Sequence, residues 1–552
     1  MSNYDIVVDY VDEIKCKITT RKEILYSLRN AFSFYADGYK FHPKYKQGLW
    51  DGKINMIDIK GNFPSGILKR ILRHCKEDGL SIKVNDIHRY KTVDVSPELI
   101  QTLCSYSRFE PYDYQQTAIK HILGKKKLLL KSPTSSGKSL MIYLTYRWCV
   151  DNDIPMLITV PSTSLAEQLI SDFRDYVADD HNVDEFVDAL YSGKDKNTPK
   201  PVIISTWQTC AKMPEAWIKK FKFYVCDEAH GASSAELTKI INNMTTCEYR
   251  IGFTGTLNGA EMHEIEMNAR FGDIYQTITT RELIDRGIVT DILIASIQLK
   301  YSAEDLAHFW KYAGSDYQKE VDFIIDSDVR NKYIINKAMN LDGNTLMLFN
   351  FIERHGDKLL DSLNAQRLKY KKRIMYVSGK VKTDKRENIR KQMDSDLPEF
   401  YEINFEKGKI IVDSIDVDFS SINTHIGKEL NVECLECDYY IEGDINGVVK
   451  NINVVEGSYI LLATYGTLST GINIKNLHHL IFCHSYKGKI RILQSIGRIL
   501  RKSKVKNKVY LHDLVDDFRK GKKENHSFRH GEIRLELYDE EQFDYEIRIE
   551  QI

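Results

Sequence analysis

The sequence has little proline, little cysteine, no excess of charge of either sign and no long apolar run. Only 11 of its 552 residues are proline while 42% are hydrophobic, which excludes a mainly disordered chain. The ten cysteines are scattered, so a disulfide-stapled secreted domain is excluded and reduced intracellular thiols are indicated. No segment approaches about 18 consecutive apolar residues and the N-terminus has no signal-peptide core, so we expect neither a membrane span nor secretion.

Charge and length limit the possibilities further. The 78 Lys and Arg residues balance 78 Asp and Glu residues, but a neutral total can hide local basic surfaces. Nucleic-acid binding therefore has to be argued from individual segments. At roughly 150 residues per domain, the length indicates about three or four domains.

The apolar pattern divides the chain into an N-terminal domain at residues 1–95, two sheet domains at 100–285 and 286–515, and a polar C-terminal tail at 516–552. In each sheet domain, short apolar runs alternate with helical segments, which indicates a parallel sheet covered by helices on both faces. The expected strands are 127–130, 156–160, 202–205, 223–226 and 250–253 in the first domain, and 346–349, 374–377, 459–463, 479–482 and 509–512 in the second.

Two segments of the second sheet domain stand apart from this pattern. A charged stretch at 280–341 reads as a helical connector. Residues 394–456 interrupt the sheet pattern and read as β-structure, because Ile415, Val417 and Phe419 alternate with aspartates. Asn446-Gly447 adds a hairpin-turn signal. We therefore expect a β-rich insertion within the second sheet domain.

The segment Ser-Pro-Thr-Ser-Ser-Gly-Lys-Ser at 132–139 lies between an apolar strand and a helix, the context that a phosphate-binding loop requires. Its backbone N–H groups and the helix N-terminus would hold phosphates, Lys138 would reach the β- and γ-phosphates, and the Ser139 hydroxyl would hold Mg²⁺. Ser132 departs from the usual glycine, and the alternative is a Ser/Gly-rich surface turn. The predicted nucleotide-binding residues here are Pro133, Thr134, Ser135, Ser136, Gly137, Lys138 and Ser139.

Asp227-Glu-Ala-His230 follows the expected strand at 223–226. A carboxylate at a strand end can hold Mg²⁺, and its neighbour can orient or deprotonate the attacking water. We assign the first role to Asp227 and the second to Glu228. The alternative is a charged helix start, but the position some ninety residues after a phosphate loop favours the catalytic reading.

The segment Gln-Ser-Ile-Gly-Arg-Ile-Leu-Arg at 494–501 lies late in the second sheet domain. Arg498 and Arg501 are three residues apart, so on a helix they would share one face. Two guanidinium groups facing a triphosphate would stabilise transition-state charge, and Gln494 could hold the attacking water. The alternative is a solvated basic helix, since four lysines follow closely.

Aromatic residues and lysines interleave at 35–53. The aromatics Tyr39, Phe41, Tyr45 and Trp50 could stack on bases, while lysines contact phosphates. Alternatively, the aromatics form the core of a small domain with the lysines at its rim. We expect both, with about half of the aromatics buried. The predicted nucleic-acid-binding residues in this segment are Lys40, Lys44, Lys46 and Trp50.

The order of these segments resembles that of the superfamily-two helicases of the DEAD/DEAH type over about residues 108–515. The resemblance implies two RecA-like domains in tandem that use ATP and Mg²⁺, the latter held by Ser139 and Asp227. Thr254-Gly-Thr256 resembles the motif that follows the acidic motif, although its middle residue departs from the usual alanine. By this resemblance, the nucleotide contacts also include Gln115, Gly471 and Asn473. The nucleic-acid contacts include Pro161, Ser162, Thr163, Thr206, Trp207 and Thr464.

The N-terminal run at 34–54 and several phrases of the core are similar to the UvsW family, the recombination helicases of tailed phages. The resemblance implies an ATP-dependent helicase that unwinds branched DNA, migrates junctions, reverses forks and dissociates RNA–DNA hybrids in phage recombination, replication and repair. It also implies a protein of the host cytoplasm without membrane partners, which we expect to be a monomer. The insertion at 394–456 is not part of the family pattern.

The expected fold class is therefore α/β, with a small α+β N-terminal domain, two RecA-like domains and a β-rich insertion in the second. Three other functions remain open. An RNA helicase would share the same core, because such cores grip mainly the backbone. A motor subunit of a restriction complex would need a nuclease domain, for which no convincing residues are present. A binding protein with an inactive ATPase is disfavoured by the intact catalytic residues.

Overall fold

The structure is a computed structural model of the 552-residue chain. It describes residues 4–89, 91–191, 198–233, 235–257, 259–370, 372–379, 381, 383–394, 400–404, 409–412, 415–418, 430–434, 439–443, 452–454, 458–469, 474–503 and 506–552. Within this described part of the chain, no helix is long and apolar enough to cross a membrane. The chain forms two compact units, Met1–Glu282 and Leu283–Ile552, which are described separately below.

The first unit begins with a small four-stranded sheet of order β5-β2-β1-β6, in which β1 pairs antiparallel with β2 and parallel with β6. Its helices α1 and α3 bury Leu28, Leu68 and Ile71 in a core shared with the sheet. The elements are β1 (Ile6–Tyr10), β2 (Lys15–Thr20), α1 (Lys22–Ala31), β5 (Asn62–Pro64), η2 (Ser65–Ile67), α3 (Leu68–Glu77), β6 (Ile82–Val84) and η3 (Ile87–Arg89). This module confirms the expected small α+β domain.

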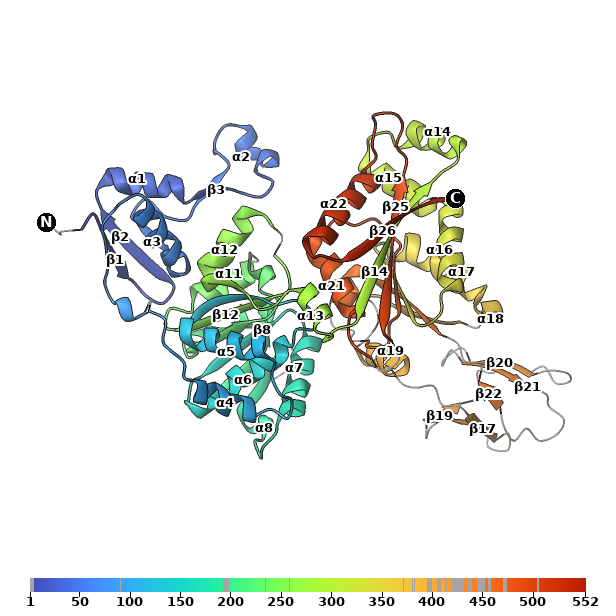
Figure 1. Cartoon of the computed structure of the whole chain (residues 1–552), viewed down its shortest axis with the longest axis horizontal. Helices are drawn as coiled ribbons and strands as arrows, with labels where there is room; N and C mark the ends of the chain where they lie inside the picture. Colours follow the sequence, from blue (N-terminus) through green and yellow to red (C-terminus); the bar gives the residue numbers. More distant parts are fainter. Residues whose placement is uncertain are drawn as a thin grey trace. The chain divides into compact units, whose positions relative to one another are not determined.

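Residues 33–55 form an extension of this module, which we name the arm. A two-stranded ladder of β3 (Ser33–Tyr35) and β4 (Lys53–Asn55) forms its base, and η1 (Tyr39–Phe41) and α2 (Pro43–Lys46) lie between them. Figure 1 shows α2 standing away from the sheet that contains β1 and β2.

The rest of the first unit is a seven-stranded parallel sheet of order β13-β7-β12-β11-β8-β10-β9. Its central strands are apolar and fully buried because helices cover both faces. The strands are β7 (Lys127–Lys131), β8 (Met156–Val160), β9 (Val187–Leu190), β10 (Val202–Thr206), β11 (Phe223–Cys226), β12 (Tyr249–Thr254) and β13 (Asp273–Gln276). The helices are α4 (Pro97–Ser105), α5 (Asp113–Lys125), α6 (Lys138–Asp151), α7 (Thr163–Tyr176), α8 (Val183–Phe186), α9 (Trp207–Cys210), α10 (Glu215–Ile218), η4 (Ala229–Ser233), α11 (Ala235–Asn242), α12 (Glu261–Phe271) and α13 (Thr280–Asp285).

The N-terminal module is joined to this sheet domain by buried polar contacts. Arg250, at the start of β12, is completely buried and donates to the Glu13 backbone oxygen (2.6 Å), to Ser65 Oγ (3.0 Å) and to the Arg270 backbone oxygen (3.1 Å). Lys127 Nζ adds an ion pair to Glu13 at 2.9 Å. Apolar side chains of α12 also belong to the core of the module. Module and sheet domain therefore form one unit.

The second unit holds a seven-stranded parallel sheet of order β16-β23-β15-β24-β25-β14-β26. The strands are β14 (Asp291–Lys300), β15 (Thr345–Phe349), β16 (Arg373–Val377), β23 (Tyr459–Thr464), β24 (His479–Phe482), β25 (Lys508–Asp517) and β26 (Asp544–Gln551). The helices are α14 (Ala303–Tyr312), α15 (Tyr317–Asp326), α16 (Asp328–Asn340), η5 (Ile352–Gly356), α17 (Asp357–Asn364), α18 (Arg367–Tyr370), α19 (Thr383–Asp394), α20 (Tyr465–Ser469), α21 (Lys489–Ile499) and α22 (His526–Glu540). Two parallel sheets in tandem confirm the expected fold class.

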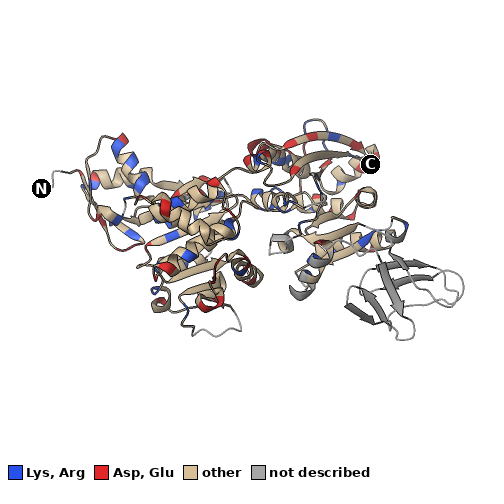
Figure 2. Ribbon diagram, turned by 60° about the horizontal axis from the view of Figure 1, so that its bottom comes forward, with Lys and Arg blue, Asp and Glu red and all other residues tan. Residues whose placement is uncertain are grey.

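Two expectations for this unit are corrected. The stretch at 280–341 is not wholly helical, because β14 crosses it and pairs with β25 and β26 inside the sheet. Its run of isoleucines and leucines favours a buried strand. The segment at 516–552 is not a peripheral tail, because α22 packs on β25 and β26 forms an edge of the sheet. Figure 2 shows that basic and acidic residues are interspersed over both units, in keeping with zero net charge.

The insertion forms a sheet of its own, of order β19-β18-β17-β22-β21-β20, between α19 and β23. Its described strands pair antiparallel, which agrees with the expected β-rich insertion. They are β17 (Phe400–Asn404), β18 (Lys409–Val412), β19 (Ile415–Asp418), β20 (Leu430–Cys434), β21 (Tyr439–Gly443) and β22 (Ile452–Val454). Phe419 and the expected Asn446-Gly447 turn lie outside the described residues.

Candidate ATP site and nucleic-acid interface

The loop at 132–139 runs from the carboxyl end of β7 to the N-terminus of α6. Its curvature depends on left-handed backbone at Ser135 (φ 68°) and Gly137 (φ 76°). The hydroxyls of Ser132 and Ser136 lie 2.6 Å apart, and Ser136 also donates to the Pro133 backbone oxygen. Ser132, which replaces the usual glycine, is buried and therefore braces the loop from inside. Backbone N–H groups and a helix N-terminus meet here as phosphate binding requires.

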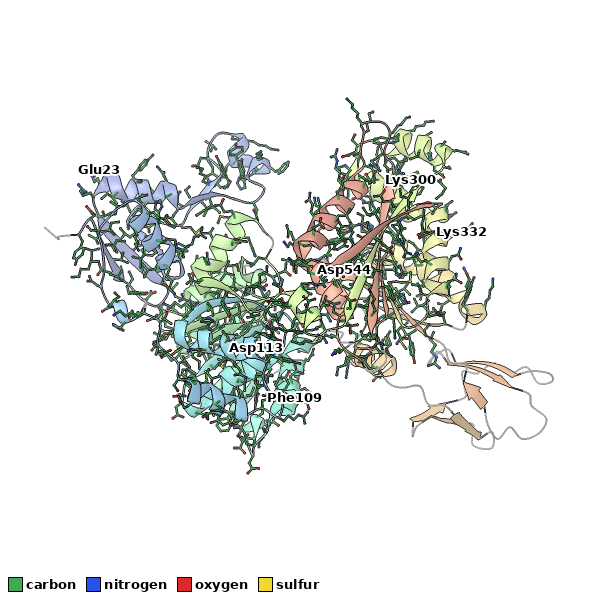
Figure 3. The ribbon with its side chains drawn as sticks, viewed as in Figure 1. Glu23, Phe109, Asp113, Lys300, Lys332 and Asp544 are labelled. Carbon is green, nitrogen blue, oxygen red and sulfur yellow. The ribbon has the colours of Figure 1, made fainter. Side chains whose placement is uncertain are left out.

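Gln115 ties this loop to α5. Its side-chain amide donates to the Ser136 backbone oxygen at 2.9 Å and accepts from the Tyr112 backbone N–H at 2.9 Å. A Cβ on Gly137 would lie 2.2 Å from the Gln115 amide nitrogen, so only glycine allows this approach. Asp113 marks the start of α5 in Figure 3. Gln115 is thus placed beside the loop, and its contact with the nucleotide stays a prediction.

The residues at the end of β11 lie next to the loop. Lys138 Nζ is 3.8 Å from Glu228 Oε1 and donates to the Ser132 backbone oxygen at 3.4 Å. Nδ1 of His230 is 3.2 Å from both Glu228 Oε2 and Thr254 Oγ1. The structure therefore brings Lys138, Glu228, His230 and Thr254 together.

Asp227 meets the requirements of a cation ligand. Burial, and then the neighbouring Glu228 carboxylate, raise the pKa of Asp227 to about 6. Two adjacent carboxylates in a buried position repel each other, and a divalent cation would relieve that repulsion. Carboxylate and hydroxyl oxygens are the ligands that Mg²⁺ prefers, so Asp227 and Ser139 fit this ion.

The predicted nucleic-acid contacts of the first unit lie at the carboxyl ends of two neighbouring strands. Pro161, Ser162 and Thr163 follow β8, and the Ser162 hydroxyl caps α7 by accepting from the Leu165 N–H at 3.4 Å. Thr206 ends β10, which lies next to β8 in the sheet, and Trp207 begins α9. A Cβ on Gly231 would lie only 2.4 Å from the Trp207 ring. The ring therefore packs directly against the η4 turn of the acidic motif.

Gln494, Arg498 and Arg501 lie in the second unit. Gln494 and Arg498 are four residues apart on α21, whose opposite side buries isoleucines. α21 ends at Ile499, so Arg501 lies just beyond it, and its backbone oxygen accepts from Thr290 at 3.4 Å. The expectation that both arginines share one helix face is therefore wrong in detail, because the helix ends between them.

The remaining residues of the second unit are partly described. Thr464 ends β23, and its hydroxyl lies 2.6 Å from that of Thr467 in the first turn of α20. Gly471 and Asn473, predicted nucleotide contacts, lie outside the described residues.

On the arm, Lys40, Lys44 and Lys46 are all exposed, and no acidic partner is found for them among the described residues. Tyr39, Tyr45 and Trp50 are half-buried against one another or their neighbours, whereas Phe41 is 79% exposed. The Trp50 indole donates to the Lys53 backbone oxygen at 2.8 Å and its ring contacts His42 edge-on. The aromatics are therefore mainly a scaffold, and a base contact by Trp50 stays a prediction.

Three contacts of the site carry no signal in the sequence. Tyr176 OH lies 2.7 Å from Ser139 Oγ, Thr277 donates to Ser132 Oγ at 2.9 Å, and Tyr114 OH donates to the Ser136 backbone oxygen at 2.9 Å. Tyr176 and Thr277 come from α7 and the segment after β13, so only the folded sheet brings them to the loop. Two of these contacts restrain Ser139 and Ser136, which are predicted nucleotide contacts, and the third restrains Ser132 at the start of the same loop.

Two family models match the chain. The model of the Type III restriction enzyme res subunit matches residues 108–259, and the model of the N-terminal region of the DNA helicase UvsW matches residues 5–85. The first match spans most of the first sheet domain, and the second spans the N-terminal module.

Longer stretches of the chain are also similar to known proteins. The chain is 31% identical over 563 aligned residues to the ATP-dependent DNA helicase uvsW of Enterobacteria phage T4, covering 98% of each chain. The crystal structure of T4 UvsW is 28% identical, covers 99% of each chain and has a TM-score of 0.46. The Type ISP restriction-modification enzyme LlaBIII bound to DNA is 14% identical, covers 80% of this chain and 31% of its own, and shares the fold with a TM-score of 0.50.

Proposed function

The chain belongs to the UvsW family of ATP-dependent DNA helicases, and from that membership we propose that it acts on branched DNA. The activities proposed are unwinding of forks, migration of four-way junctions, fork reversal and dissociation of RNA–DNA hybrids during phage recombination and repair. The observation that carries the proposal is the N-terminal module, whose arm presents three exposed lysines beside the ATP-hydrolysing domain. A helicase core grips mainly the backbone and has little preference for DNA shape, so substrate choice needs a further surface.

Hydrolysis follows from the site described above. Lys138 neutralises charge on the β- and γ-phosphates, and the N–H groups of the loop hold them from below. Glu228 orients and deprotonates the attacking water, while His230 links Glu228 to Thr254 at the end of β12. We assign Mg²⁺ to Ser139 and Asp227, where the ion would neutralise phosphate charge. To Arg498 and Arg501, both of the second unit, we assign the stabilisation of transition-state charge, and to Gln494 the attacking water.

Gln115 selects the base, since its amide is already oriented by Ser136 and Tyr112. The segments after β8 and β10 hold the DNA backbone, because their hydroxyls and backbone N–H groups lie at the carboxyl edge of the sheet. Trp207, packed on η4, connects this strand-binding edge to the acidic motif.

The test replaces Lys40, Lys44 and Lys46 with alanine in the full-length protein and measures binding to forked and four-way DNA over a range of salt. Each lost phosphate contact should lower the salt slope by about 0.9, so the slope should fall by about 2 to 3. Deleting the module is a poorer test, because the buried Arg250 would lose two of its three acceptors.

The matched control replaces Lys22, Lys60 and Lys91, three exposed lysines of the same module outside the arm, and removes the same charge. The control variant should keep most of the wild-type salt slope of DNA binding. Equal loss in both variants would mean that the arm holds no preferred site. Wild-type binding and unwinding of branched DNA by the Lys40/Lys44/Lys46 triple variant would overturn the role of the arm in substrate choice.

A further inference from the structure

The arm ends in apolar side chains that the fold does not use. Phe41 is 79% exposed and Leu49 is 74% exposed, on a segment of only 23 residues. Figure 3 shows the side chains of this segment projecting outward around α2. Two large apolar side chains exposed on one short segment, one in η1 and the other just after α2, indicate a contact surface.

The arm has the stiffness that such a surface needs. Tyr39 stacks on Tyr35 with ring centroids 4.5 Å apart and meets Tyr45 edge-on at 4.9 Å. Gly52 packs so closely on Tyr39 that a Cβ would lie 2.5 Å from its ring. The half-buried aromatics thus form a small core inside the arm, which leaves Phe41 and Leu49 at its surface.

The base of the arm is anchored to the ATP-binding domain. β3 contacts α12, and Met262 and Ile265 of α12 share a core with Phe32 at the foot of the arm. α12 begins five residues after Thr256 and also packs against η4 of the acidic motif. A tip held in this way moves with the domain that hydrolyses ATP.

The surrounding charge identifies the partner as nucleic acid. Within residues 33–55 there are four lysines against two aspartates, and Lys40 and Lys44 flank Phe41 in the sequence. Nζ of Lys40 and of Lys53 lie 5.9 Å and 5.1 Å from the centroids of the Tyr39 and Tyr35 rings, so the cations line the scaffold. Exposed bases stack on aromatic side chains, and apolar wedges such as Phe and Leu insert where base pairs are unstacked.

We propose that Phe41 and Leu49 form a wedge that stacks on the base pair exposed at the branch point of a DNA junction while the arm lysines hold the flanking phosphates. The wedge rests on the proposed action on branched DNA and assigns that action to two residues. It separates strands because the motor draws the duplex against a fixed apolar tip. The lysines set affinity, and the wedge sets the yield of strand separation.

The test uses the full-length protein with Phe41→Ala/Leu49→Ala and four-way DNA carrying 2-aminopurine at the branch point. Wild-type protein should raise 2-aminopurine fluorescence at the branch point but not at a position well inside an arm of the DNA. The double variant should lose this rise and unwind on the order of tenfold more slowly, the loss expected for one base–aromatic stack. Its ATP hydrolysis stimulated by single-stranded DNA should be affected less. The fold reduction in hydrolysis should be at least five times smaller than the fold reduction in the unwinding rate.

Two further variants separate the outcomes. Tyr26→Ala removes another exposed aromatic, 65% exposed on α1, and should behave as wild type. Replacing Phe41 with Trp instead of Ala should restore the fluorescence change. A double variant that keeps the wild-type signal and unwinding rate overturns the wedge, as does one that changes the oligomeric state, since the tip would then contact a second copy. A wild-type protein that neither binds nor unwinds branched DNA overturns the proposed function itself.

Discussion

At the scale of single residues, the proposed roles separate nucleotide binding from hydrolysis. Lys138 lies on the phosphate loop and Glu228 lies 3.8 Å away at the end of β11, so each can be removed without deleting the other. Lys138→Ala should abolish DNA-stimulated ATP hydrolysis. Glu228→Gln should bind ATP and hydrolyse it roughly a hundredfold more slowly, because the water loses its base. Single-turnover hydrolysis and nucleotide-binding assays measure the two steps, and normal turnover by Glu228→Gln would refute the assignment.

Arg501 offers a second test at this scale. It lies just beyond α21 in the second unit, whereas the proposed phosphate loop belongs to the first. An arginine that contacts only the transition state lowers kcat when removed and leaves ATP affinity nearly intact. We expect Arg501→Ala to reduce kcat at least tenfold more than it weakens ATP binding. Loss of ATP binding with unchanged kcat would indicate a ground-state contact instead.

At the scale of elements, the junction between the N-terminal module and β12 depends on one buried guanidinium. Arg250→Met keeps the aliphatic length but leaves the Glu13 and Arg270 carbonyls and Ser65 Oγ without this donor. In urea, the free energy of unfolding of the first unit should be lower by about 3 kcal/mol than in the wild type.

The control for this junction is Arg21→Met, whose side chain is 72% exposed and paired with Asp5. Its effect should stay within about 0.5 kcal/mol. If Arg250→Met is as stable as this control, the module is held by apolar contacts alone.

The insertion gives a second prediction for an element. Asp394 should be kept, because its carboxylate accepts from the Lys475 and Asn476 N–H groups at 2.7 and 3.1 Å. Replacing residues 395–456 with a Gly/Ser linker of about eight residues should leave basal ATP hydrolysis within about twofold of wild type, because the insertion forms a separate sheet. An insoluble or inactive product would show that the insertion is integral to the second unit.

At the scale of the whole molecule, buried histidines make the second unit sensitive to acid. Burial lowers the pKa of His484 to about 4 and that of His512 to about 3. Both imidazoles are neutral in the folded unit, whereas the unfolded chain binds their protons below about pH 6.5. The stability that they contribute is therefore present above pH 6.5 and is lost as pH falls through 4.

Hydrogen exchange followed by mass spectrometry reads the two units separately and should show the second unit losing protection between about pH 6.5 and 4. His484→Gln should remove up to about 3 kcal/mol of this pH dependence, because burial lowers the pKa of His484 from 6.5 to about 4 and each pH unit between them is worth about 1.36 kcal/mol. An unchanged pH dependence in this variant would mean that His484 does not contribute to the acid sensitivity.

The local sequence determined the parallel strands and the loops that follow them, because apolar runs of four or five residues and glycine-containing turns are local signals. β8, β11 and β24 have the predicted bounds for this reason. It also placed Lys138, Asp227 and Glu228, since the carboxyl ends of neighbouring parallel strands meet at one edge of a sheet.

Tertiary structure alone decided contacts between segments far apart in the chain. Tyr176 meets Ser139 and Arg250 meets Glu13 only after the sheet has assembled, and no local pattern encodes such pairs. The sequence pattern does not reveal β14, because the charged flanks of β14 resemble those of helices. It does not reveal β26 either, because polar residues alternate along that strand, as suits a half-buried strand at the edge of a sheet. The arm shows the same division: its aromatic and basic composition was visible in the sequence, but only packing decided which rings form its scaffold and that Phe41 stays exposed.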